Sequence, residues 1–226
     1  MRLQRSTSLV GHWKFNEKSG IIANDSSRYR NTGTLTGASH LPIWSDKGIK
    51  FDGVDDYVNA GSGFYMGNST MTISSWIYTP TTFEYNITTD KTIFARNNAD
   101  ISATYNGYKL GWYKHGGVRF RAYNDPTGYD VQTSASLSAG WHHIVGVRNS
   151  SNMLLYVDGI SYIGSAISDA VIIGGGTYPY PTIGAIRHFG IANPFLGSID
   201  EVRIYNRALS AAEIKRNYEA TKHNYI

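Results

Sequence analysis

The stretch Gly117-Val-Arg-Phe-Arg-Ala-Tyr123 has the clearest local pattern in the chain. Every second residue is apolar, namely Val118, Phe120 and Ala122. The residues between them are Arg119, Arg121 and Tyr123. Alternation with one polar face is typical of a β-strand that is covered on one side only.

Short segments of the same kind recur on both sides of this stretch. Strands are expected at residues 9–15, 49–51, 57–58, 71–77, 92–95, 108–113, 141–147, 153–157, 160–163, 182–185 and 198–205. Asp158-Gly159 between two of them is a type I′ hairpin signal. Many short strands without intervening helical patterns predict an all-β, two-sheet antiparallel sandwich. At this length, residues 1–226 are expected to form one domain.

The orientation of some side chains follows from the same alternation. In residues 9–15 the core face is expected to carry Leu9, Trp13 and Phe15. In residues 71–77 it is expected to carry Met71, Ile73 and Ile77. The tryptophans expected in the core are Trp13, Trp76, Trp112 and Trp141.

One short helix is expected near the C-terminus. Ser210-Ala-Ala-Glu213 is a capping box, in which the Ser210 hydroxyl accepts from the Glu213 amide and the Glu213 carboxylate accepts from the Ser210 amide. Leu209 and Ile214 occupy the positions of a hydrophobic staple. Ile214 and Tyr218 share one face, so the helix is expected to dock on the sandwich.

Composition supports a large core and limits the possible partners. The chain has 226 residues, 41% of them hydrophobic, with 17 Tyr, 24 Gly and no Cys. Without cysteine there are no disulfides and no thiolate metal sites. The net charge of +4 suits an acidic partner, but the basic residues are scattered, which argues against nucleic acid.

No targeting or membrane segment is recognisable. No apolar run approaches the roughly 18 residues that a membrane span needs, so no membrane insertion is expected. The N-terminal residues 1–15 contain arginines but no apolar run of the kind found in a signal peptide. The protein is nevertheless expected to be extracellular or surface-exposed, on a cell or a virion, with no signal peptide in this chain.

Ordered blocks of sequence carry a family resemblance. They include GHWKFNEKSG at 11–20, FDGVDDYV at 51–58, TISSW at 72–76, LYVDG at 155–159 and, as the most specific, GSIDEVRIYNRALS at 197–210. Together they resemble the laminin-G-like, concanavalin A-like lectin/glucanase domains. The resemblance implies a jelly-roll sandwich that recognises carbohydrate or protein.

Calcium is one candidate ligand. Asp25 and Asn31 lie close in sequence in a loop, and oxygen-rich loops suit this cation. The resemblance implies that Asp200 and a carbonyl near Gly33 join them, giving calcium a structural role. The alternative is that Asp25 and Asn31 only form Asx turns, and both interpretations remain open. Asp52, Asp55 and Asp56 form a second acidic group, in which turns are favoured over metal binding.

Two surfaces are candidate ligand sites. The first is the polar face with Arg119, Arg121 and Tyr123, which Lys109 and Tyr113 are expected to adjoin, since cationic and aromatic side chains suit sugar binding. The second is a loop with Tyr178 and Tyr180, which His188 is expected to approach. The alternatives are a solvated strand face for the first and a protein anchor for the second.

No catalytic constellation is recognisable, so the chain is not expected to be an enzyme. The glucanases of this fold carry carboxylates along one strand as Glu-x-Asp-x-x-Glu, and no such string occurs. His142 and His143 are adjacent on a strand, so their rings point to opposite faces and make a poor metal site. The main hypothesis is therefore a non-catalytic module that binds glycan or polysaccharide. Alternatives are a virion decoration protein that packs against neighbouring structural proteins, with a homo-oligomer as one form, and an accessory module of a polysaccharide-degrading enzyme.

Overall fold

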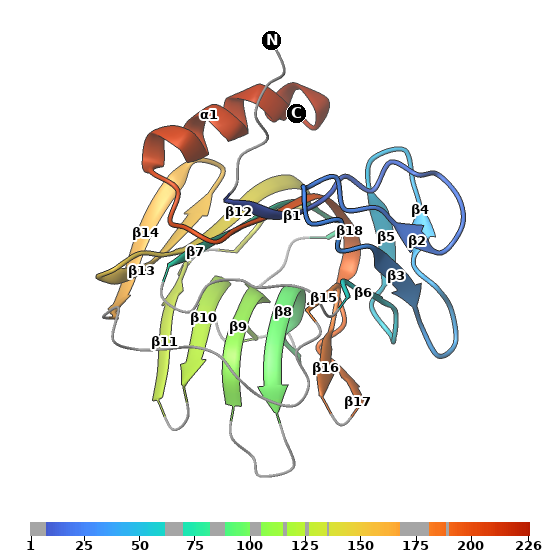
Figure 1. The fold of residues 1–226 in the computed structure, drawn as a ribbon, viewed down its shortest axis with the longest axis horizontal. Coiled ribbons are helices and arrows are strands. Elements are labelled where there is room, and N and C mark those ends of the chain that lie inside the picture. The colour runs from blue at the N-terminus through green and yellow to red at the C-terminus, as the bar shows by residue number, and fades with distance from the viewer. Residues whose placement is uncertain are drawn as a thin grey trace.

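The structure is a computed structural model, which describes residues 8–61, 70–81, 89–99, 105–114, 117–124, 127–134, 136–167, 181–188 and 190–226. Two large antiparallel sheets pack face to face (Figure 1), as a jelly-roll sandwich requires. This confirms the expected fold class.

The first sheet is called the helix-covered sheet. Its strand order is β14-β13-β12-β7-β18-β5-β4, and β1 also pairs with β18. The strands are β1 (Leu9–Trp13), β4 (Ile43–Trp44), β5 (Ile49–Asp52), β7 (Met71–Thr79), β12 (Gly140–Arg148), β13 (Asn152–Val157), β14 (Ile160–Ala166) and β18 (Leu196–Tyr205). Asp158 and Gly159 both have positive φ, as a type I′ turn between β13 and β14 requires.

The second sheet is called the pocket sheet. Its order is β11-β10-β9-β8-β15-β6-β3-β2. The strands are β2 (Ile22–Ala23), β3 (Gly33–Thr36), β6 (Tyr57–Asn59), β8 (Lys91–Ala99), β9 (Tyr105–Trp112), β10 (Val118–Asn124), β11 (Thr127–Gln132) and β15 (Thr182–Ile183). A separate hairpin consists of β16 (Ile186–His188) and β17 (Gly190–Ala192).

The core between the sheets is aromatic and aliphatic. Trp13, Trp112 and the expected Met71, Ile73 and Ile77 all belong to one buried cluster. The expectation for Leu9 was wrong, because a β-bulge between Leu9 and Gly11 shifts the register of β1. Val10 and Trp13 therefore face the core, whereas Leu9 is only partly buried.

Two of the expected core tryptophans lie on the other face of the helix-covered sheet. Trp76 is buried, but its ring stacks on Tyr225 at 4.2 Å and on Tyr218 at 5.7 Å. Trp141 is half-buried beside Tyr78 and Tyr225. Trp76 is therefore buried as expected, but under the C-terminal segment and not between the two sheets. The expectation that Trp141 lies in the core was wrong, because this segment covers it only in part.

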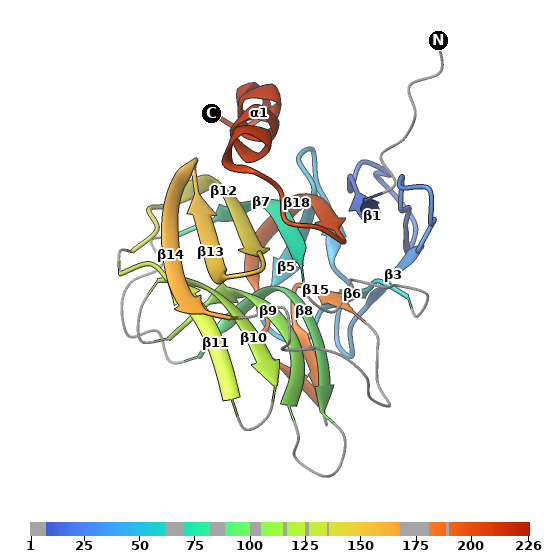
Figure 2. The same cartoon turned by 60° about the vertical axis from the view of Figure 1, so that its left-hand side comes forward.

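That layer is α1 (Ala211–Thr221), which lies across the outer face of the helix-covered sheet (Figures 1 and 2) and continues into a 3₁₀ turn, Lys222–Asn224. Ser210 and Glu213 form the expected capping box. Leu209 and Ile214 pack with Val145 and Val147 of β12 in a second apolar cluster. No helix in the described part of the chain is long and apolar enough to cross a membrane.

Candidate functional site

The pocket sheet displays a polar outer face on β8, β9, β10 and β11, which lie side by side in Figures 1 and 2. Alternation sends Phe120 of β10 and Leu110 of β9 into the core. Arg121 therefore lies on the outer face, and its register partners are Lys109 on β9 and Asp130 on β11. Three neighbouring strands thus bring charged side chains together.

These side chains line a small pocket that is open to solvent. Its lining residues are Asp90, Lys109, Gly111, Trp112, Tyr113, Arg119, Arg121 and Tyr123. All five residues that the sequence analysis placed on the sheet-face site are among them. The structure therefore gathers this predicted group in one hollow.

Lys109 is the most buried of the three cations that line the pocket. It is 7% exposed, and its Nζ donates to Asp90 Oδ2 at 2.6 Å. The other oxygen of Asp90 accepts the backbone amide of Lys114 at 3.1 Å. Burial lowers the pKa of Lys109, while the charge of Asp90 opposes this effect.

Arg119 and Arg121 extend over the rings of two tyrosines. The Arg119 guanidinium lies 4.3 Å from the Tyr113 ring centroid, and that of Arg121 lies 4.6 Å from the Tyr123 centroid. Arg119 also donates to Asp130. These contacts hold both arginines in defined positions, and burial raises the pKa of the Tyr123 hydroxyl.

Gly128 makes room for the Arg121 side chain. A Cβ atom at Gly128 would lie 2.3 Å from an Arg121 guanidinium nitrogen, much closer than non-bonded atoms can approach. Gly128 pairs with Tyr123 across β10 and β11. The absence of a side chain there lets the guanidinium lie flat on the sheet.

Two carboxylates, Asp90 in the pocket and Asp130 beside it, were not expected from the sequence. Asp130 could have been found, because a hairpin after residues 117–123 brings the following strand beside Arg119 and Arg121. Asp90 reaches Lys109 only through the pairing of β8 with β9, which local sequence does not reveal. The predicted loop site included Tyr178, Tyr180 and His188. Tyr178 and Tyr180 lie outside the described residues. His188 is the last residue of β16, and only its backbone is described.

The residues expected to bind calcium do not fit a cation as they are arranged. The Asp25 carboxylate accepts five hydrogen bonds, from the His12 amide, from the amide and hydroxyl of Ser27, and from the amide and side chain of Asn31. These donors point positive hydrogens at both oxygens, where a cation would need free lone pairs. The contacts match the Asx-turn alternative.

Asp200 and Gly33 have other roles. Asp200 accepts from the Tyr225 hydroxyl at 2.7 Å and from the Glu201 amide at 2.9 Å, and burial raises the pKa of Asp200 to about 6. Gly33 pairs with Ala23, and a Cβ there would lie 2.8 Å from Val58. Among the residues that the structure describes, no three His, Cys, Asp or Glu side chains are grouped so as to hold a metal.

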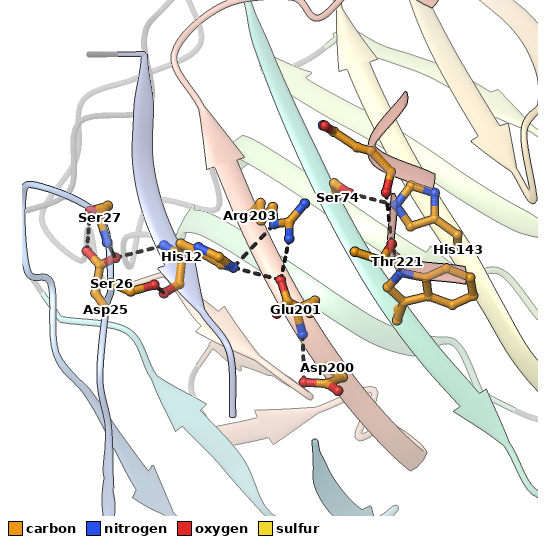
Figure 3. Close-up of polar contacts among 12 residues, drawn as sticks. His12, Asp25, Ser26, Ser27, Ser74, His143, Asp200, Glu201, Arg203 and Thr221 are labelled. Atoms are coloured by element: carbon orange, nitrogen blue, oxygen red, sulfur yellow. Dashed lines mark hydrogen bonds and ion pairs between the residues drawn. The ribbon is translucent and has the colours of Figure 1, made fainter. Parts of the chain in front are cut away.

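A second polar cluster ties β1 to β18 (Figure 3). His12 Nε2 lies 2.7 Å from Glu201 Oε2, and Arg203 donates to the same oxygen at 2.6 Å. Burial opposes ionisation of Glu201, but the bond from His12 and the charge of Arg203 lower its pKa to about 2. The cluster links β1 to β18, because Glu201 Oε2 is contacted by both His12 and Arg203 of the protein itself.

Ser74 and His143 form another close pair, with Oγ and Nε2 3.0 Å apart (Figure 3). Both side chains are buried, and His143 packs against Trp76 and Tyr218 of α1. Burial lowers the pKa of His143 to about 4. No described residue hydrogen-bonds His143 Nδ1, so the pair lacks the orienting third group of a catalytic triad.

Comparison with known proteins identifies the family of this chain. Residues 52–215 match the family model described as the concanavalin A-like lectin/glucanases superfamily, of laminin-G type. A search of curated protein sequences finds no significant match. Many solved structures share the fold.

Domain 4 of AbnA, a GH43 extracellular arabinanase from Geobacillus stearothermophilus in complex with arabinotriose, matches with a TM-score of 0.70 and 19% identity, over 92% of this chain and 97% of that one. The binding domain of botulinum neurotoxin DC, in complex with rat synaptotagmin II, matches with a TM-score of 0.64 and 14% identity, over 94% of this chain and 51% of that one. Trypanosoma rangeli sialidase in complex with sialic acid gives a TM-score of 0.64 and 17% identity, over 94% of this chain and 33% of that one. At these identities the likeness establishes the fold, and the family match covers most of the sequence. The chain belongs to the concanavalin A-like lectin/glucanase superfamily.

Proposed function

We propose that this protein is a non-catalytic carbohydrate-recognition module that binds its glycan in the pocket on the outer face of the pocket sheet. The observation that carries the proposal is the convergence of Tyr113, Tyr123, Arg119, Arg121 and Lys109 around one hollow. Aromatic rings offer apolar faces to sugar C–H groups, and the cations donate to hydroxyl or acidic oxygens. Domain 4 of AbnA, which shares the fold over nearly its whole length, is described in complex with arabinotriose, which is consistent with such a role.

The proposal needs neither calcium nor a catalytic group. The Asp25 carboxylate is filled by protein donors, and the Ser74–His143 pair is buried beneath α1. A glycan-binding role also leads us to propose an extracellular or surface location, because cell-surface glycans and polysaccharides are accessible there.

A glycan array with the wild-type protein and two variants tests the site. Tyr113→Ala removes a pocket ring, and we expect it to weaken glycan binding about tenfold, as is common when a central aromatic is truncated at an interface. Tyr78→Ala is the matched control, because Tyr78 is 37% exposed on the other sheet and should leave binding unchanged. Absence of glycan binding by the wild-type protein would overturn the function. Equal binding by Tyr113→Ala would overturn the location of the site.

A second candidate is a structural protein, for instance of a virion, that packs against protein neighbours. Its supporting observation is the exposure of Ile160 (63%) and Ile163 (75%) on β14, which is the edge strand of the helix-covered sheet. Exposed apolar edge strands favour association. Light scattering of the wild-type protein and of Ile163→Lys measures whether the protein self-associates through β14. A stable wild-type oligomer that becomes monomeric in the variant supports self-association. A wild-type monomer at all concentrations contradicts it.

A further inference from the structure

The pocket holds more positive than negative charge. Three cations, Lys109, Arg119 and Arg121, line it together with one carboxylate, Asp90, and a second carboxylate, Asp130, lies beside it on β11. Asp90 pairs with Lys109, and Asp130 hydrogen-bonds Arg119. Asp130 is shared, because it also forms a longer ion pair with Arg121 at 3.9 Å. Three cations therefore face two carboxylates, which leaves one surplus positive charge.

Arg121 is held in place without a hydrogen-bonded carboxylate among the described residues. Its Nε lies 3.9 Å from Asp130 Oδ2, which is beyond hydrogen-bond distance. Its position comes from the stack on Tyr123 and from the space over Gly128. Its side chain is 30% exposed, so its guanidinium is oriented by the protein and accessible from the pocket.

A preorganised guanidinium of this kind is suited to one type of ligand group. Its planar donors match the paired oxygens of a carboxylate or a sulfate, and such charge-assisted bonds are stronger than bonds to neutral hydroxyls. The immobilisation by Tyr123 reduces the entropy that is lost when the bond forms. One surplus positive charge matches one negative group.

We propose that the pocket selects glycans that carry an oxyanion, either the carboxylate of an acidic sugar or a sulfate ester, and that Arg121 pairs with that group. This inference rests on the proposed glycan-binding function and adds the chemical class of the ligand. The neighbouring Asp130 sets the strength of the interaction, because its negative charge competes with the ligand for Arg119 and Arg121.

Two variants with opposite expected effects test the inference. Arg121→Gln removes the guanidinium that has no hydrogen-bonded carboxylate and should weaken binding of an acidic glycan at least tenfold, the scale of a lost charge-assisted hydrogen bond. Asp130→Asn removes the competing carboxylate and should strengthen it several-fold. A purely structural role of either residue does not predict a gain. Arg28→Gln is the control, because it removes the same charge from an exposed residue of the loop after β2.

The probes are uronic-acid oligosaccharides, their carboxyl-reduced forms, sulfated oligosaccharides, their desulfated forms and polyglutamate, each titrated calorimetrically at low and high salt. We expect binding to an acidic form, loss of binding when its acidic group is removed, and weakening by salt. Preference for the uronic acid or for the sulfated glycan would identify the source of the oxyanion.

Three results would contradict the inference in distinguishable ways. Equal binding of neutral and acidic glycans, abolished by Tyr113→Ala but not by Arg121→Gln, would overturn the acidic class and leave the proposed function standing. Binding of polyglutamate as tight as that of the glycans would overturn the glycan class in favour of an acidic protein segment. Absence of binding to every glycan, charged or neutral, would overturn the proposed function itself.

Discussion

At the scale of single residues, buried polar side chains mainly fix the backbone of this protein. Asp25 is the clearest case, since its carboxylate joins β1 to the segment around Ser27 and Asn31. Such a group stabilises the fold through the donors that it satisfies, and a cation is not needed for this role.

The Asp25 network predicts a calcium-independent effect on stability. Asp25→Ala leaves several donors without an acceptor and should lower the free energy of unfolding by roughly 3 kcal/mol or more. Thermal unfolding with added calcium and with chelator measures it. Asp46→Ala, at a fully exposed carboxylate, is the control. A melting temperature that falls on chelation in the wild type, but not in Asp25→Ala, would show that a calcium ion is bound there.

Asp56 gives a prediction of pH dependence. It is 1% exposed and accepts the Asp52 amide, and burial raises the pKa of Asp56 to about 7. The folded state therefore holds a proton that the unfolded state has released, and stability should fall as pH rises from about 4 to 7.

Asp56→Asn removes this ionisation. The wild-type protein should lose roughly 2–4 kcal/mol of unfolding free energy from this residue between pH 4 and pH 8, and the variant should lack that loss. Urea unfolding at both pH values measures the difference, with Asp46→Asn as the exposed control. Parallel pH profiles for wild type and Asp56→Asn would contradict the assignment.

At the scale of elements, β10 and α1 determine what the outer faces of the two sheets present to solvent. Alternation in β10 places Phe120 in the core and Arg119 and Arg121 outside, so one strand contributes both to the core and to the lining of the pocket. Helix α1 covers the other sheet instead, since Tyr218 stacks on Trp76 and Ile214 packs with Val145 and Val147 of β12.

The cap of α1 predicts a stability loss confined to this element. Ser210→Ala removes the acceptor for the Glu213 amide and should lower the free energy of unfolding by about 1 kcal/mol. The change in tryptophan fluorescence that is lost in a Trp76→Phe background reports whether α1 stays docked, because Trp76 stacks on Tyr218. Ser210→Asp keeps a capping oxygen and should retain most of the wild-type stability. Equal losses for both variants would contradict the capping role.

At the scale of the whole molecule, the two sheets have different outer faces. The helix-covered sheet buries Trp76 and His143 under α1, whereas the pocket sheet leaves its charged side chains around a hollow. Substitutions under α1 should therefore change stability, and substitutions in the pocket should change ligand affinity. The Tyr113, Arg121 and Asp130 variants proposed above should accordingly unfold within about 1 kcal/mol of the wild type, because partly exposed surface residues usually contribute little to stability.

The sequence by itself determined the class of fold, the approximate strand positions, the turn at Asp158-Gly159, the capping box at Ser210 and the outward face of β10. These features depend on local periodicity and backbone preference, which neighbouring residues specify. Tertiary structure decided that Trp76 lies under α1 and that the bulge in β1 turns Val10 toward the core in place of Leu9. It also decided that Asp90 reaches Lys109 and that Asp130 pairs with Arg119. Each of these outcomes requires the pairing or covering of segments far apart in the chain, and the free energy of such contacts depends on burial and partners that no single segment encodes.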